Sequence, residues 1–192
     1  GAPFIWGTLH DFGGVDGMWG SFPELVTGPL IAFCNATTVT GIGMLPEGID
    51  QNTAWYTLLL DTNWVTVGSR RAEAISCSAG DTLLDVEAWV AAWALQRYGS
   101  GPGEDAARQA WALLASTVYS DSQTGGTDRE DQADALTSYP VGAAQENVAP
   151  KPDWYNTSAV FEAWELLVSV AEQRRQANAT TPLLSTLNYG EY

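Results

Sequence analysis

The segment from Gly41 to Asn52 has the composition of a strand that ends in a chemically active loop. Its first half is apolar and glycine-rich, and a single carboxylate, Glu47, follows between a proline and a glycine. Glycines inside a strand allow another group to approach the backbone closely, and barrel enzymes hold catalytic groups at the carboxyl ends of their strands. Glu47 is therefore a candidate catalytic residue, although Pro-Glu-Gly is also an ordinary turn sequence.

A second glycine-rich segment follows the opening apolar run and carries the chain's single histidine, His10, with Asp11 and Asp16 close behind. These acids could complete a pair with Glu47, since glycoside hydrolysis needs two carboxyl groups roughly 5 to 9 Å apart. For Asp11, a turn or capping role is the alternative. His10 could bond a sugar hydroxyl or brace the loop, and the sequence leaves both roles open.

The composition excludes several classes of function. Of 192 residues, 23 are acidic and 8 are basic, which gives a formal charge of −15 and argues against a nucleic-acid partner. No apolar run approaches the roughly 18 residues of a membrane-spanning helix. Cys34 and Cys77 allow at most one disulfide. With 45% hydrophobic residues and no apolar run of that length, we expect a soluble globular protein. Because no Cys/His cluster is present, we expect no metal site, and we expect no cofactor.

The cellular location of the protein is indicated by three Asn-x-Ser/Thr glycosylation sequons, at Asn35, Asn156 and Asn178. Together they favour a secreted or lysosomal glycoprotein. The chain begins without an initiator Met or an apolar leader, so we expect that any signal peptide has been removed or lies outside it.

Nine tryptophans require an explanation in a chain of this length. Helical spacing among apolar residues predicts core positions for four of them: Trp89, Trp93, Trp111 and Trp164. Four others flank glycine-rich loops, where core packing is favoured but stacking on a sugar stays possible: Trp6, Trp19, Trp55 and Trp64.

The pattern of predicted elements changes along the chain. Strands and helices alternate first: a buried strand over 1–9, a helix over 22–33, a strand over 37–44 and a helix over 52–61. Three helices follow, over 85–98, over 104–119 and from Ser158 to about 175. Asp85 is the expected N-cap of the first and Ser158 that of the third, and Gly99 is expected directly after the first helix ends. For the last helix we expect a buried face formed by Phe161, Trp164, Leu167, Val168 and Ala171.

Several blocks of the sequence resemble one family, the lysosomal α-N-acetylglucosaminidases of glycoside hydrolase family 89. The similar blocks occur in the family's order and are Phe4-Ile5-Trp6-Gly7-Thr8-Leu9-His10-Asp11-Phe12-Gly13-Gly14, residues 41–52, Asp85-Val86-Glu87-Ala88-Trp89-Val90 with Arg97-Tyr98-Gly99, and residues 154–164.

The resemblance implies the C-terminal part of a (β/α)8 TIM barrel over residues 1–68, a connector over 69–80 and the start of an all-helical domain over 81–192. It implies a retaining exo-enzyme that removes terminal α-linked N-acetylglucosamine, as in heparan sulfate degradation, with no cofactor.

The resemblance also implies roles for single residues. Glu47 would be the nucleophile, Leu9 and Phe12 would line the sugar pocket beside His10, and Asn35 would carry a glycan, as would Asn156.

The chain departs from the family pattern in three ways. The family's general acid lies on an earlier barrel strand, outside this chain, so the fragment alone is expected to be inactive. Asp11 stands where the family usually has Asn, and residues 120–132 lack a His and two cysteines that relatives carry. The alternative hypothesis is therefore a non-catalytic carbohydrate-binding or interaction protein of the same descent.

Overall fold

A computed structural model describes residues 1–10, 18–46, 53–71, 77–78, 80–120 and 155–180. The described elements are two strands and five helices: β1 (Phe4–His10), α1 (Phe22–Asn35), β2 (Val39–Pro46), α2 (Thr53–Arg71), α3 (Val86–Tyr98), α4 (Glu104–Ser116) and α5 (Thr157–Thr180). The alternating strands and helices followed by helices alone agree with the predicted change of pattern.

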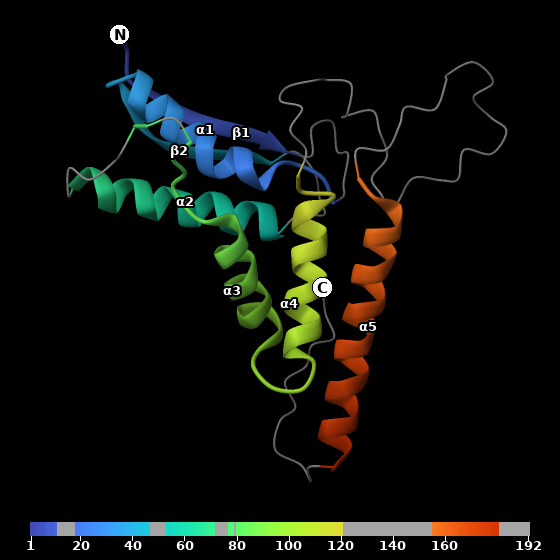
Figure 1. Cartoon of the computed structure of the whole chain (residues 1–192). Helices are drawn as coiled ribbons and strands as arrows, with labels where there is room; N and C mark the ends of the chain where they lie inside the picture. The colour runs from blue at the N-terminus through green and yellow to red at the C-terminus, as the bar shows by residue number, and fades with distance from the viewer. Residues whose placement is uncertain (11–17, 47–52, 72–76, 79, 121–154, 181–192) are drawn as a thin grey trace, which may run out of the picture.

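β1 and β2 pair in parallel, and α1 and α2 lie on one side of this two-stranded sheet. The helices α3, α4 and α5 extend away from the sheet (Figure 1). The prediction that β1 is a buried strand over 1–9 is wrong. It begins at Phe4, and of its residues only His10 is buried. Successive side chains of a strand point to opposite faces, so Trp6 and His10 face the helices, whereas Ile5 and Leu9 are 63% and 41% exposed on the other face.

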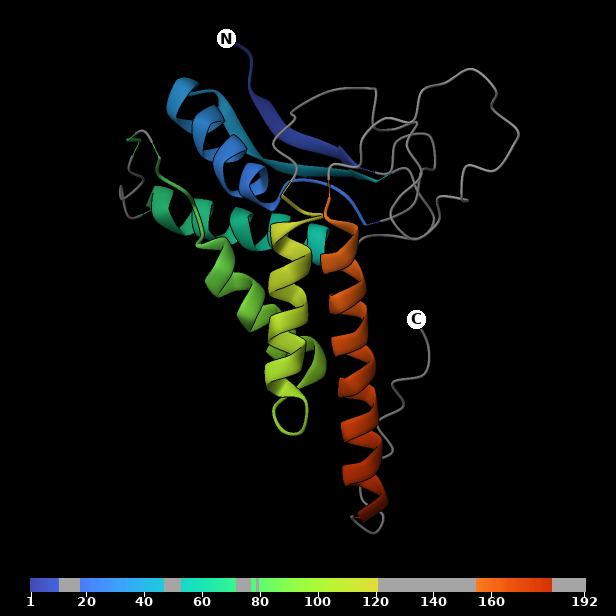
Figure 2. The ribbon, with the colours of Figure 1, turned by 45° about the vertical axis from the view of Figure 1, so that its right-hand side comes forward.

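The helical part is an antiparallel arrangement in which α4 lies between α3 and α5 (Figure 2). The predicted N-cap of α3 is confirmed, because the Asp85 carboxylate accepts hydrogen bonds from the backbone N–H groups of Glu87 and Ala88. Gly99 follows α3 with a φ of +73°, as expected. The members of the apolar stripe predicted over 104–119 are all buried: Ala107, Trp111, Leu114 and Val118. The predicted end of the helix is wrong, because α4 ends at Ser116 and Val118 lies beyond it.

The prediction for the buried face of α5 is confirmed for Leu167, which packs against the core, and is wrong for the larger side chains. Phe161, Trp164 and Val168 are 65%, 58% and 42% exposed. The buried side of α5 is formed by Val160, Ala163 and Val170, each one position before a predicted residue, and by Leu167, which is partly buried.

Close approach between the helices explains which face is buried. A Cβ atom on Gly103, at the start of α4, would lie 3.0 Å from the Cα of Val170. Helices that approach this closely accept small side chains at the contact and leave little room for aromatic ones. The N-cap prediction was wrong as well, because α5 begins at Thr157 and the Asn156 side chain accepts the N–H of Ala159.

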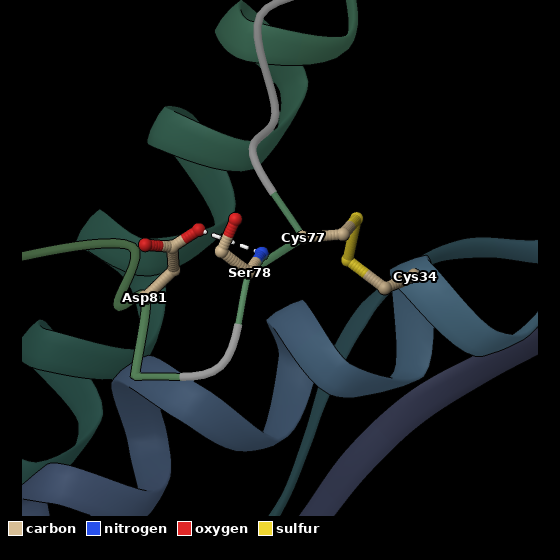
Figure 3. Close-up of a disulfide and its surroundings, with 4 residues drawn as sticks. All are labelled: Cys34, Cys77, Ser78 and Asp81. Carbon is tan, nitrogen blue, oxygen red and sulfur yellow. Dashed lines mark hydrogen bonds between the residues drawn. A yellow bond between two sulfur atoms is a disulfide. The ribbon is translucent and has the colours of Figure 1, made fainter.

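α2 is longer than predicted and continues to Arg71, so the first residues of the expected connector, 69–71, are helical. Beyond it, Cys77 forms a disulfide with Cys34 near the end of α1, and Asp81 accepts the backbone N–H of Ser78 at 2.8 Å (Figure 3). The sequence had left this pairing open. None of the described helices has the length and apolar character needed to cross a membrane.

Loss of this disulfide should destabilise the protein. Cys34 and Cys77 are 43 residues apart, and opening a loop of that size increases the entropy of the unfolded chain by an amount worth about 4 kcal/mol. A Cys34→Ser/Cys77→Ser variant should therefore melt about 10 °C lower than the parent protein under non-reducing conditions. Reductant should lower the melting temperature of the parent but not of the variant; an equal shift in both would contradict the assignment.

The two faces of α5 should respond differently to substitution. Ala163→Leu adds volume to a fully buried contact and should cost about 1 to 3 kcal/mol of unfolding free energy. Trp164→Gln, on the exposed face, should change it by about 0.5 kcal/mol or less. Denaturant unfolding of both variants measures the difference. A larger loss of unfolding free energy in Trp164→Gln than in Ala163→Leu would indicate that the face predicted from the sequence is the buried one.

Candidate active site

The candidate site lies at the carboxyl ends of the two parallel strands. In the register of the sheet Leu9 is opposite Leu45 and His10 is opposite Pro46. Glu47 follows Pro46 directly in the sequence, and neighbouring strands are about 4.8 Å apart. The backbone that leads to Glu47 and the backbone of His10 are therefore at the same edge. Glu47 itself lies outside the described residues, as do Phe12 and Asp11.

The face of the sheet that leads to this edge is exposed and combines glycines with aliphatic side chains. Ile5, Gly7 and Leu9 are opposite Gly41, Gly43 and Leu45 on it. The side chains of Leu9 and Leu45 are 41% and 55% exposed. Leu9, which the resemblance places in a sugar pocket, is thus accessible at the end of its strand.

His10 is in a different position, because its imidazole is fully buried. One face of the ring stacks on Trp19 with centroids 4.4 Å apart, and the ring also stacks on Trp55 at 4.7 Å. The edge of Tyr56 lies at 5.8 Å. The Nε2–H group donates a hydrogen bond to the Trp19 carbonyl at 3.1 Å. These contacts favour the bracing role that the sequence left open.

The cluster of His10, Trp19, Gly20, Trp55 and Tyr56, here called the His10 cluster, requires a glycine at its centre. Gly20 has a φ of +121°, a region that L side chains rarely adopt. A Cβ atom there would lie 2.2 Å from Cζ3 of Trp55. Trp55 therefore packs directly on the backbone of the segment that precedes α1.

The His10 cluster continues into the helical part through Phe22. Phe22 stacks on Tyr119 with ring centroids 4.2 Å apart and contacts Trp55 at 6.5 Å. Its backbone N–H donates to the Tyr119 carbonyl at 2.9 Å. Sequence analysis did not identify Phe22 or Tyr119 as important for the site, because neither has an apolar periodicity that points to a partner about a hundred residues away.

The tryptophans divide differently from the prediction. Trp93 and Trp111 are buried as expected and Trp89 is partly buried, whereas Trp164 is exposed. Among those considered for stacking on a sugar, Trp55 is buried in the core and Trp64 is 72% exposed.

The three predicted glycosylation residues, Asn35, Asn156 and Asn178, are exposed in the structure. In the described part of the chain, no cluster of three or more His, Cys, Asp or Glu side chains could hold a metal ion.

Comparison with known proteins decides the family. Residues 1–66 match the family described as alpha-N-acetylglucosaminidase (NAGLU) tim-barrel domain, and residues 89–181 match the alpha-N-acetylglucosaminidase (NAGLU) C-terminal domain. The chain belongs to the α-N-acetylglucosaminidase family. Over 174 residues it is 39% identical to alpha-N-acetylglucosaminidase from Homo sapiens. This alignment covers 89% of this chain and 20% of the human protein.

Solved structures support the same family fold. The chain is similar to a family 89 glycoside hydrolase from Clostridium perfringens in complex with 2-acetamido-1,2-dideoxynojirmycin, with a TM-score of 0.66, 23% identity, and coverage of 90% of this chain and 18% of that one. A complex of the Clostridium perfringens protein with its substrate GlcNAc-alpha-1,4-galactose gives a TM-score of 0.60 at 21% identity, covering 92% and 18%. The chain thus spans about a fifth of the length of these family members.

Because Trp55 packs on Gly20, replacing Gly20 by alanine should lower the unfolding free energy more than replacing another glycine with a positive φ. Gly101 is the matched control, because its φ of +116° is similar to that of Gly20 and a Cβ atom there would have open space for 4 Å around it. Both Gly→Ala variants should lose stability through backbone strain, but Gly20→Ala should lose about 1 to 3 kcal/mol more because it displaces the indole. Equal unfolding free energies for the two variants would contradict this packing.

Proposed function

We propose that this chain is the part of a retaining exo-glycosidase that carries the nucleophile, and that the full-length polypeptide removes terminal α-linked N-acetylglucosamine from glycans of the heparan sulfate type. The main support is that residues 1–66 match the barrel domain of the family and residues 89–181 match its C-terminal domain. Glu47 follows β2 directly in the sequence, and the last residue of β2, Pro46, is opposite His10 at the end of β1, which is consistent with that role. The activity of the human relative and the substrate of the Clostridium perfringens relative supply the chemistry.

In the proposed reaction the Glu47 carboxylate attacks the anomeric carbon of the terminal sugar. The glycosidic bond breaks as its oxygen takes a proton from a general acid that the full-length polypeptide carries outside this chain. Water then attacks the anomeric carbon of the covalent glycosyl intermediate and gives a proton to the same residue that served as the acid, while the bond from the sugar to Glu47 breaks and frees the carboxylate. Two inversions leave the sugar with its original α configuration. Leu9 and Phe12 would contact the sugar.

We also propose that residues 1–68 are the C-terminal part of a (β/α)8 barrel, that 69–80 connect it to the next domain and that 81–192 begin a helical domain. A lysosomal or secreted location fits three features: the exposed sequon residues, the Cys34–Cys77 disulfide and the family match. Disulfides persist in oxidising compartments, and N-glycans are attached along the secretory route.

Replacing Glu47 tests the proposal directly. In the full-length polypeptide, Glu47→Gln should lower kcat for an aryl α-N-acetylglucosaminide by about four orders of magnitude, because an amide is a poor nucleophile. Glu87→Gln, an exposed glutamate on α3, is the matched control and should keep the parental rate. NMR of the parent reaction should show the α anomer as the first product.

Three outcomes separate the hypotheses. Retained activity in Glu47→Gln would contradict the assignment of the nucleophile. A first product with the β configuration would contradict the retaining mechanism. Binding of N-acetylglucosamine by the parent without any release from a glycoside would favour the non-catalytic carbohydrate-binding alternative.

A further inference from the structure

We infer that His10 is a positioning residue that holds the end of β1 against the segment before α1 and the start of α2, and that it supports the candidate site in this way without touching the sugar. This inference rests on the proposed glycosidase function and assigns His10 a part in it. The histidine is the chain's only one. It is the last residue of β1, and it contacts two other segments, the residues just before α1 and the first turns of α2.

The position of His10 excludes direct contact with a ligand in this structure. The side chain has no exposed surface, and its ring is stacked against the indoles of both Trp19 and Trp55. Because a carbonyl oxygen can only accept, the bond to Trp19 requires that Nε2 carries the hydrogen. This bond and the two stacking contacts fix the orientation of the ring.

The His10 cluster brings together described residues that flank, in the sequence, residues 11–17 and residues 47–52. Residues 11–17 are flanked by His10 on one side and by the segment of Trp19 on the other. Residues 47–52, which include Glu47, are flanked by Pro46, the register partner of His10, and by the first turns of α2, where Trp55 lies. His10 therefore contacts or pairs with anchoring residues that flank both segments.

A change in this anchoring should affect the chemical step more than ground-state binding. Misplacing a reacting group by about 1 Å can cost about a hundredfold in rate, because the nucleophile must reach a near-attack geometry. Binding of the sugar depends on contacts spread over the whole pocket, so KM should respond less than kcat.

Two variants of His10 separate its interactions. His10→Phe keeps a flat ring between the indoles but removes the N–H that donates to the Trp19 carbonyl. His10→Gln keeps an N–H donor at similar reach but has no aromatic faces. Trp164→Phe, which changes an exposed aromatic side chain on α5, is the control.

The test measures kcat, KM and thermal stability of these variants in the full-length polypeptide, with rates normalised to folded protein. We expect His10→Phe to lower kcat about 10- to 100-fold with KM within about threefold, and His10→Gln to recover part of that loss. Trp164→Phe should keep the parental kcat. An unchanged kcat in His10→Phe would overturn the inference. A selective rise in KM would also overturn it, because it would indicate direct contact with the sugar.

Amide hydrogen exchange gives a second readout that does not depend on turnover. Peptides covering residues 18–22 and 53–59 should exchange about tenfold faster in His10→Phe than in the parent, and peptides from α4 should not change. Unchanged exchange in the first two peptides would overturn the anchoring role. A parent that releases no N-acetylglucosamine would overturn the proposed function and the catalytic part of this inference, while the exchange data would still decide the anchoring.

Discussion

The contact between Phe22 and Tyr119 holds the α/β part of the chain against its helical part. The two rings are stacked within 5° of parallel, and a backbone hydrogen bond joins the same two residues. Phe22 also contacts Trp55 on one side and the edge of Trp89 on the other. Aromatic pairs of this kind are worth about 0.5 to 1.5 kcal/mol each beyond the area they bury, and here they form one continuous core.

This arrangement fixes α1 at both ends. Its N-terminus is held by the Ser21 side chain, which accepts the N–H of Glu24, and by Tyr119, while the disulfide to Cys77 holds its C-terminal end. α2 is tied to the helical part by the bond from the Trp89 indole N–H to the Asp61 carboxylate at 2.8 Å. The strand ends therefore rest on helices that are themselves constrained by distant segments, and the candidate site depends on the helical part for its geometry.

Local patterns predicted α3 and α4 well because their signals are short-range. The Asp85 cap acts on N–H groups two and three residues away, and the α4 stripe has one apolar face. α5 has apolar residues on two neighbouring stripes, so helical periodicity is compatible with the burial of either stripe, and its two aromatic side chains, Phe161 and Trp164, are exposed. The packing of α5 against α4, which is close at Gly103 and Val170, decides which stripe is buried.

The sequence by itself determined the family, the change from alternating elements to helices, and the place of Glu47 directly after a strand. The tertiary structure decided that Cys34 pairs with Cys77, that His10 is buried between two indoles, and that Tyr119 supports the start of α1. The physical reason is the range of the interactions. Caps and helical spacing act within a few residues, whereas these contacts join segments tens of residues apart, whose approach depends on how the helices pack.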